Sequence, residues 1–153
     1  MNVTLQPVTQ STLRQVLALS VSPEQASYVA GNAVSLAQAL FHPEAWYRAI
    51  CLDDAPAGFV MLEDPLLLPV PPEKPEPSLW LWRFMIDRQF QGRGIGKRAL
   101  GLVVDHARSR GAYSRLFTSY VPGPHGPEGF YRGFGFRDTG RVDGGEVVLS
   151  FPL

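Results

Sequence analysis

Apolar and polar residues alternate along several short stretches of the chain, and this two-residue period predicts β-strands. Near the N-terminus, Val3 and Leu5 alternate with polar neighbours. Two apolar stretches flank the turn-forming sequence Asp53-Asp54-Ala55-Pro56, which predicts a hairpin. The strands expected from these patterns are residues 2–6, 46–52, 57–63, 79–87, 114–121, 136–141 and 146–151.

Other stretches have the spacing of amphipathic helices, with apolar residues three or four positions apart. Ser22 and Pro23 are the residue types favoured at a helix N-cap and at the first helical position. Gly111 follows the longest helical pattern and is a typical helix-terminating residue. The helices expected are residues 11–19, one that starts at Ser22, 33–41, 94–110 and 127–133.

Residues 64–78 form a proline-rich stretch without a regular pattern. Proline fits neither a helix interior nor a central strand, so this stretch is expected to be an extended surface loop between two strands. We therefore expect one domain over residues 1–153. The mixed order of strands and helices predicts an α+β fold.

Composition narrows the classes of protein that fit. The chain has 153 residues, 45% of them hydrophobic, and a formal net charge of zero. Zero net charge argues against nucleic acid as a partner. No stretch has the pattern of a signal peptide or approaches the ~20 apolar residues of a membrane span. With a single cysteine, Cys51, no intrachain disulfide can form. The expectation is a cytoplasmic protein that binds no membrane.

A glycine-rich turn, Gln91-Gly92-Arg93-Gly94-Ile95-Gly96, lies between the strand 79–87 and the longest helix. Such a turn lets free backbone N–H groups at a helix start approach a phosphate. A P-loop would need glycine at Gln91 and a hydroxyl residue at Arg98, and both are absent. A dinucleotide fingerprint would need an acidic residue about 20 positions further on, and none occurs between Asp105 and Glu128.

The remaining phosphate ligand is the pyrophosphate of coenzyme A, and here the chain resembles the GNAT acyltransferase superfamily. Gln91, Gly94 and Gly96 match the family pattern Gln/Arg-x-x-Gly-x-Gly/Ala. Downstream, the stretch Phe130–Phe136 is similar to the family's Leu/Phe-Tyr-x-x-x-Gly-Phe. The resemblance implies a GNAT fold: one mixed, mostly antiparallel sheet of six or seven strands, flanked by about four helices.

The resemblance also implies transfer of an acetyl group from acetyl-CoA to a primary amine, without a metal. The strand before the turn would diverge from its neighbour and bind pantetheine and the acyl oxygen through its backbone. The turn would hold the pyrophosphate, with basic side chains such as Arg98 adding charge. The coenzyme-binding residues expected are Phe84, Met85, Ile86, Gln91, Gly92, Arg93, Gly94, Ile95, Gly96 and Lys97.

Tyr131 matches the family tyrosine that protonates the departing thiolate, and a phenol of pKa ~10 is a suitable acid for a thiolate whose thiol titrates near ~8.5. The chain looks most like the bacterial spermine/spermidine acetyltransferase branch, through the stretches 21–29 and 83–92. That branch commonly has an acidic residue where this chain has Trp82. Family members often have an asparagine seven residues before the tyrosine, where this chain has Pro124.

These departures leave the general base open. His125, with an unperturbed pKa near ~6.5, is the candidate base in the loop before Tyr131, and Glu24 and Glu63 are weaker ones. Tyr28 and Trp82 are the residues expected near the substrate amine. The leading hypothesis is an N-acetyltransferase for a small, polyamine-like or other amine, with a homodimer as the expected assembly. The alternative is a GNAT-shaped module that senses acyl-CoA without turnover.

Overall fold

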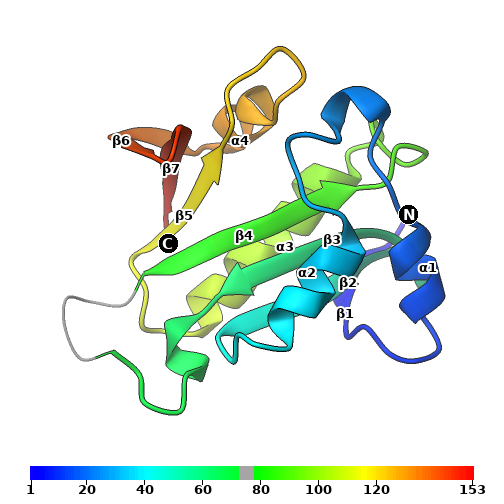
Figure 1. Cartoon of the computed structure of the whole chain (residues 1–153), viewed down its shortest axis with the longest axis horizontal. Helices are drawn as coiled ribbons and strands as arrows, with labels where there is room; N and C mark the ends of the chain where they lie inside the picture. The colour runs from blue at the N-terminus through cyan, green and yellow to red at the C-terminus, as the bar shows by residue number, and fades with distance from the viewer. Residues whose placement is uncertain (73–77) are drawn as a thin grey trace.

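Seven strands form one sheet in the computed structural model, which describes residues 1–72 and 78–153 (Figure 1). The order across the sheet is β1-β2-β3-β4-β5-β7-β6, and every neighbouring pair is antiparallel except β4 and β5. The strands are β1 (Val3–Gln6), β2 (Ala45–Leu52), β3 (Ala55–Glu63), β4 (Leu79–Ile86), β5 (Arg115–Tyr120), β6 (Arg137–Asp143) and β7 (Glu146–Pro152). The expected α+β class and mostly antiparallel sheet are confirmed.

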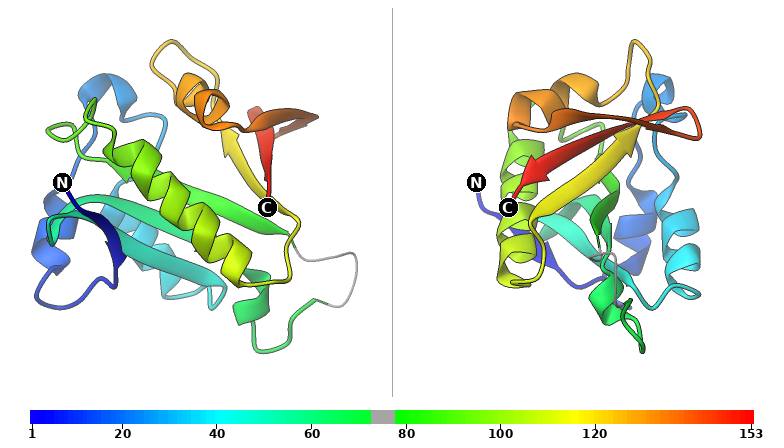
Figure 2. Two further views of the ribbon diagram at one scale, coloured as in Figure 1. Left: turned by 180° about the vertical axis from the view of Figure 1, so that it is seen from behind. Right: turned by 90° about the vertical axis from the view of Figure 1, so that its left-hand side faces the viewer.

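Helices cover both faces of the sheet, as the two views in Figure 2 show. The α-helices of the described residues are α1 (Leu13–Ala18), α2 (Asn32–Ala39), α3 (Ile95–Ser109) and α4 (Glu128–Phe134). The helix expected to start at Ser22 is reduced to one 3₁₀ turn, Pro23–Gln25, and the chain continues as a turn over residues 26–28. The other expected helices form within about two residues of their predicted ends.

The two faces of the sheet bury separate apolar clusters, because successive side chains of a strand point to opposite sides. On the α3 and α4 face, Ile50, Val60 and Leu81 pack with side chains of both helices. On the α1 and α2 face, Phe59 and Met85 pack against the helical residues that include Val16. The single cysteine, Cys51, lies in this second cluster and is 2% exposed.

A two-residue turn joins β2 to β3, so the expected hairpin is present but its turn is shorter than predicted. Asp53 and Asp54 have φ values of 48° and 68°, and Ala55 already belongs to the strand. Paired left-handed residues give a turn whose twist matches that of the strands. The backbone N–H of Asn2 donates to the Asp53 carboxylate at 2.8 Å, which fixes the turn to β1.

The expected loop 64–78 begins at a buried carboxylate. Asp64 accepts hydrogen bonds from the Tyr113 hydroxyl and, at 3.1 Å, from the backbone N–H of Leu66. Its other oxygen lies 2.6 Å from Nε of Arg110. These contacts attach the start of the loop to the end of α3. A 3₁₀ turn, Pro65–Leu67, follows, and residues 73–77 of this prediction lie outside the described residues.

The parallel strands β4 and β5 share only three residue pairs. The last of them joins Leu81 to Thr118, and beyond it the strands diverge (Figure 1). On its other edge β4 carries a bulge, because Met61 pairs with Arg83 while the next residue of β3 pairs with Leu81. Trp82 is the extra residue of this bulge. An extra residue bends a strand and redirects its side chains, here at the point of divergence.

At Gly58, strands β3 and β4 lie so close together that a side chain has no room. A Cβ at this position would collide with the carbonyl oxygen of Met85 and would lie 2.9 Å from Cδ1 of Ile86. We expect Gly58→Ala to lower the free energy of unfolding by about 1–3 kcal/mol in urea unfolding. Gly101→Ala is the matched control, because Gly101 lies in α3 and none of the described atoms comes near the added carbon. The control should stabilise the helix, and equal effects of the two variants would contradict the prediction.

Candidate active site

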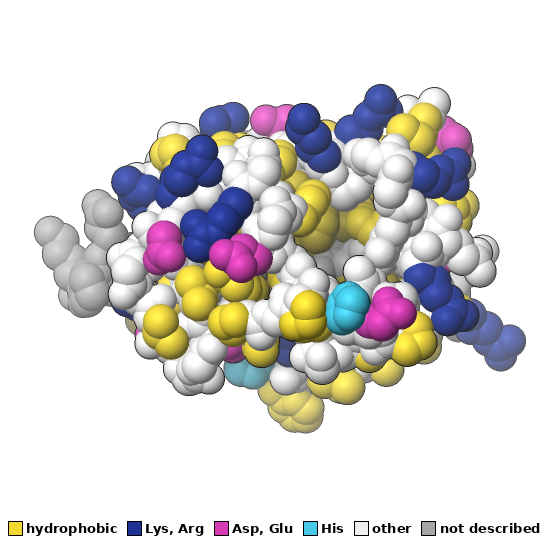
Figure 3. All heavy atoms as spheres, turned by 90° about the horizontal axis from the view of Figure 1, so that it is seen from above, with side chains coloured by type: hydrophobic (Ala, Val, Ile, Leu, Met, Phe, Trp, Pro, Cys, Tyr) yellow, Lys and Arg dark blue, Asp and Glu magenta, His cyan; other side chains and the backbone are white. Residues whose placement is uncertain are grey.

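A cleft of about 970 Å³ opens where β4 and β5 diverge. Seen from above, this face is hollowed near its middle, with hydrophobic side chains in the walls (Figure 3). The walls come from the second half of β4, the glycine-rich turn, the end of β5, α4, and the segment between α1 and α2. A site of this size is within the usual range for small-molecule ligands.

One end of the cleft is formed by the glycine-rich turn. Gly92 and Gly94 have φ values of 75° and 78°, a conformation that favours glycine. Gly94 is the N-cap of the 15-residue helix α3, so the first N–H groups of that helix lack intrahelical acceptors. Lys97, one turn into the helix, also lines the cleft. This end of the cleft therefore offers backbone donors, a helix dipole and a cation to an anion.

The floor of the cleft is the edge of β4 that β5 leaves uncovered. Phe84, Met85 and Ile86 all line the cleft, and within the described residues none of them pairs with β5. The Met85 side chain is buried in the core, and Phe84 stacks on Phe130 of α4 with ring centroids 5.7 Å apart. The side chains hold the strand in place, while its open edge faces the cleft.

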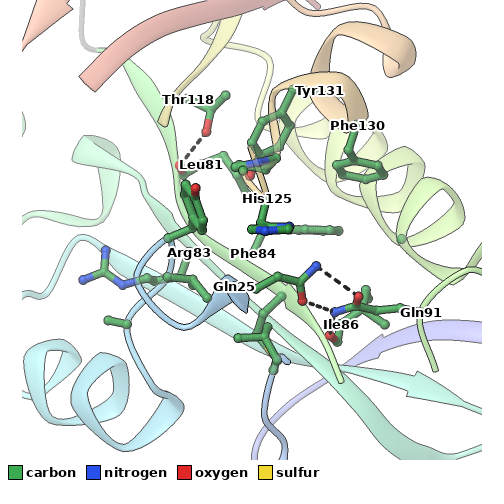
Figure 4. Close-up of a pocket in the computed structure, with 18 of the residues that line it drawn as sticks. Gln25, Leu81, Arg83, Phe84, Ile86, Gln91, Thr118, His125, Phe130 and Tyr131 are labelled. Carbon is green, nitrogen blue, oxygen red and sulfur yellow. Dashed lines mark hydrogen bonds between the residues drawn. The ribbon is translucent and has the colours of Figure 1, made fainter. Parts of the chain in front are cut away.

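Tyr131 projects from α4 toward the point of divergence, near Thr118 and His125 in Figure 4. It is 6% exposed and packs edge-on against Phe136, with ring centroids 5.5 Å apart. Burial raises the pKa of the Tyr131 phenol to about 12, against a smaller lowering influence of the Thr118 side chain. The phenol is thus held in its neutral, proton-donating form over the physiological pH range.

The opposite end of the cleft combines carboxylates with indole rings. Glu63 ends β3 beside Trp80 of β4, and Glu146 begins β7. Burial, followed by the nearby charge of Glu44, raises the pKa of the Glu63 carboxyl, which makes it a stronger base than an exposed glutamate. Trp82, the residue of the bulge, is partly buried and also lines this end.

Arg83 lies in the same region, but its guanidinium points toward α2 in Figure 4. It donates to the Gln38 side chain at 3.0 Å and to the Trp82 carbonyl at 3.2 Å. Burial lowers the pKa of Arg83, while the charge of Glu146 raises it. The Arg83 guanidinium is thus hydrogen-bonded on the α2 side, while Glu63 and Glu146 place two carboxylates in the lining of the cleft.

Most residues predicted for the site come together in this cleft, and Arg93 does not. The side chain of Arg93 is exposed and its guanidinium lies 5.8 Å from the ring of Phe90. Arg98 donates to the Met1 carbonyl at 3.1 Å, and so points toward the N-terminus. The predicted residues that line the cleft are Tyr28, Trp82, Phe84, Met85, Ile86, Gln91, Gly92, Gly94, Ile95, Gly96, Lys97, His125 and Tyr131.

Several lining residues were not predicted. Glu146 has no motif around it, Thr118 and Ser119 belong to a strand in which nothing singled them out, and Gln25 was not assigned a role. The signal for Gln25 was present, since it lies in the stretch 21–29 that carries the family resemblance. The position of Glu146 depends on how β7 pairs with β5, which no local pattern encodes.

Metal-binding clusters and membrane-spanning helices are both absent from the described residues. Among residues 1–72 and 78–153, no cluster of three or more His, Cys, Asp or Glu side chains could hold a metal ion. In the same part of the chain, no helix combines the length and the apolar character needed to cross a bilayer.

Sequence comparison relates the chain to acetyltransferases. Residues 14–136 match the model of the family described as "Acetyltransferase (GNAT) family". The chain is 28% identical to the spermine/spermidine N(1)-acetyltransferase of Bacillus subtilis strain 168, over 100% of both chains. The probable spermine N(1)-acetyltransferase of Bacillus subtilis subsp. natto is also 28% identical over the full length of both.

Solved structures share the fold at lower sequence identity. An acetyltransferase from Thermus thermophilus has a TM-score of 0.72 and 23% identity, and the match covers 100% of this chain and 98% of that one. A GNAT family acetyltransferase from Elizabethkingia anophelis, solved with acetyl-CoA bound, has a TM-score of 0.66 and 18% identity over 99% of each chain. These likenesses confirm the expected fold.

Proposed function

The chain belongs to the acetyltransferase (GNAT) family, and on that basis we propose that it transfers an acetyl group from acetyl-CoA to a primary amine of a small molecule. One observation carries the proposal: the open edge of β4 leads directly into the glycine-rich turn. The strand edge and the turn lie along one cleft, which fits an extended ligand with a phosphate at one end. Coenzyme A has this form, with its pyrophosphate at the turn and its thioester at the divergence.

The proposed chemistry is direct attack of the amine on the thioester. The acceptor loses a proton to a base, and its nitrogen then attacks the acetyl carbonyl to form a tetrahedral intermediate. Backbone donors at the β4 edge stabilise the developing oxyanion. The C–S bond breaks as Tyr131 gives its proton to the departing thiolate of coenzyme A. The nitrogen of the intermediate loses its remaining extra proton to water, and water gives a proton back to Tyr131. The products are the neutral N-acetylated amine and the free thiol, and one proton is left on the base.

The acceptor that best fits the cleft is a cationic, polyamine-like amine. Glu63 and Glu146 supply negative charge at the acceptor end, and Trp80 and Trp82 supply aromatic surfaces for an ammonium group. The relatives from Bacillus subtilis are named for spermine and spermidine, which supports this class of acceptor.

The first test is thiol release from acetyl-CoA with a panel of polyamines, amino acids, aminoglycosides and peptides with free N-termini. We expect steady turnover with at least one small amine and none without an amine.

Gly94→Val should weaken coenzyme A binding in calorimetry, because a side chain at φ 78° strains the turn and crowds the phosphate. Coenzyme binding without turnover on any amine would favour the binding-only sensor. Absence of coenzyme binding would contradict both functions.

The second test concerns the proton donor. Tyr131→Phe keeps the ring and removes the acid, so we expect turnover to fall by about 10²-fold with little change in coenzyme affinity. An ordinary phenol would lose its proton near ~10, but burial raises the pKa of Tyr131 to about 12. The wild-type rate should therefore show no loss from phenol ionisation between pH 7 and about 11. Tyr120→Phe is the matched control, since Tyr120 is buried outside the cleft lining. Near-normal turnover of Tyr131→Phe would mean that water or His125 supplies the proton.

The third test identifies the base. Two residues of the cleft can accept the proton of the ammonium group: His125, predicted from sequence, and Glu63, whose pKa is raised by burial. Either group accepts a proton only when unprotonated, so its ionisation sets a rate that falls as the pH is lowered. We expect one of His125→Gln and Glu63→Gln to abolish this acid limb in profiles of kcat/KM. Retention of the limb by both variants would exclude both residues as the base.

Two predictions from sequence accompany this proposal. Self-association stays a prediction, to which the exposed Leu40 and Phe41 after α2 add apolar surface. Light scattering at micromolar concentration measures it. A cytoplasmic location likewise stays an expectation.

A further inference from the structure

The segment between α1 and α2, residues 21–30, contributes Val21 and residues 25–30 to the lining of the cleft, and we call it the strap. Its first end is fixed at Ser20, whose N–H donates to the Asp87 carboxylate at 2.8 Å and whose carbonyl accepts from Arg88 at 2.9 Å. Its second end is fixed at the buried Asn32, whose side chain donates to the Val16 carbonyl at 2.8 Å. Between these points Val21 and Val29 pack against the apolar cluster of the α1 and α2 face, while other residues of the strap face the cleft.

The strap contacts the glycine-rich turn through a reciprocal pair of amides. Nε2 of Gln25 donates to Oε1 of Gln91 at 3.2 Å, and Nε2 of Gln91 donates to Oε1 of Gln25 at 2.9 Å. The same Nε2 of Gln91 donates to the Ile86 carbonyl at 2.9 Å. Figure 4 shows the two side chains facing each other, with Ile86 beneath them. The Gln91 side chain thus joins the strap, the turn and the end of β4.

The strap also contacts the opposite wall of the cleft. The ring of Tyr28 lies so close to the loop between β5 and α4 that a Cβ on Gly123 would collide with its hydroxyl. A Cβ on Gly126 would lie 3.1 Å from Cε1 of the same ring. The strap is therefore held between the glycine-rich turn on one side and the loop before Tyr131 on the other.

We propose that Gln25 is a positioning residue that couples the strap to coenzyme binding. It holds the side chain of Gln91, and through it the turn 91–96, in the form that receives the pyrophosphate. A ligand that orders the turn then also orders the strap, and order in the strap favours the ligand in return, since such coupling is reciprocal. The proposal rests on the proposed function, because the ligand of the turn is coenzyme A.

The size of the effect follows from the exposure of the pair. Gln91 is exposed and Gln25 is partly buried, so water competes for both amides. Loss of such a pair should lower affinity by about 3- to 10-fold, the usual scale for one exposed hydrogen-bonded unit. The contact is strong enough to bias the strap and weak enough to open when ligands enter and leave.

Calorimetric titration with coenzyme A on the full chain tests the coupling. We expect Gln25→Ala and Gln91→Ala each to lower the affinity for coenzyme A by about 3- to 10-fold. The double variant should lose no more affinity than the single variant with the larger loss. Gln89→Ala is the matched control, because Gln89 is an exposed glutamine close to the same turn. Its backbone N–H donates to the Asp87 carboxylate, and its side chain makes no hydrogen bond within the described residues. The control should bind within about 2-fold of wild type. Additive losses in the double variant, or an equal loss in the control, would overturn the proposal.

Hydrogen exchange measures whether coenzyme binding at the turn also protects the backbone amides of the strap. A role of Gln25 confined to its own turn would not change that protection. In the wild type, coenzyme A should slow exchange of backbone amides in both 22–30 and 91–97. In Gln25→Ala, protection of 91–97 should persist while that of 22–30 is lost. Protection of the strap that is equal in both proteins would show that Gln25 does not couple the two segments.

The Gln91→Ala variant separates this role from local capping. Oε1 of Gln25 also lies 3.4 Å from the backbone N–H of Ser22, which it caps. Gln91→Ala keeps Gln25 and its cap on Ser22 but removes both hydrogen bonds of the pair, so it should weaken coenzyme binding as Gln25→Ala does. Wild-type affinity in Gln91→Ala, with weakened binding in Gln25→Ala, would assign the effect to the cap and overturn the proposal. If the wild type itself fails to bind coenzyme A, the proposed function fails; if it binds and the variants match it, only this inference fails.

Discussion

The site depends on a single constraint, the short pairing between the parallel strands β4 and β5. Their ladder ends at Leu81 and Thr118, and within the described residues no strand takes the place of β5 beyond that point. A buried strand edge without partners is costly, because its peptide groups must find other hydrogen bonds. Here the end of the edge is satisfied locally, by the Gln91 side chain at the Ile86 carbonyl. The Phe84 ring of β4 stacks on the Phe130 ring of α4, a contact that joins this helix to the uncovered part of the strand.

The chemistry of the cleft follows from unequal burial of its ionisable groups. Tyr131 sits where water is excluded, so burial raises its pKa and its proton is retained far above the ordinary range. Glu63 is only partly buried, and the pKa of its carboxyl shifts in the direction that favours proton uptake. For the proposed reaction, the cleft thus holds a candidate proton donor, Tyr131, and one of the two candidate bases, Glu63. Acid–base catalysis in one site requires such a pair, in which one group keeps its proton and the other accepts one.

Local patterns predicted most of the fold because each depends on neighbours in sequence. The alternation in β2 and β3, the spacing in α3 and the residue types of the glycine-rich turn all predicted the element that forms. The bulge at Trp82 escaped prediction, because it arises from register against β3 and not from a property of tryptophan. Among the site residues, the backbone positions of the turn were predictable, whereas Gln25 and Glu146 reach the cleft through contacts between distant segments.

The position of Cys51 has a consequence for the redox behaviour of the protein. A reaction that releases coenzyme A produces a free thiol. Once this thiol is oxidised to a disulfide, an accessible cysteine thiolate can attack that disulfide to form a mixed disulfide and release one thiol. Cys51 is the only cysteine of the sequence, it is 2% exposed, and burial raises the pKa of its thiol. It is thus protected by both access and ionisation. Oxidised coenzyme A should therefore form no mixed disulfide with the protein, because the one cysteine of the sequence is neither accessible nor readily ionised.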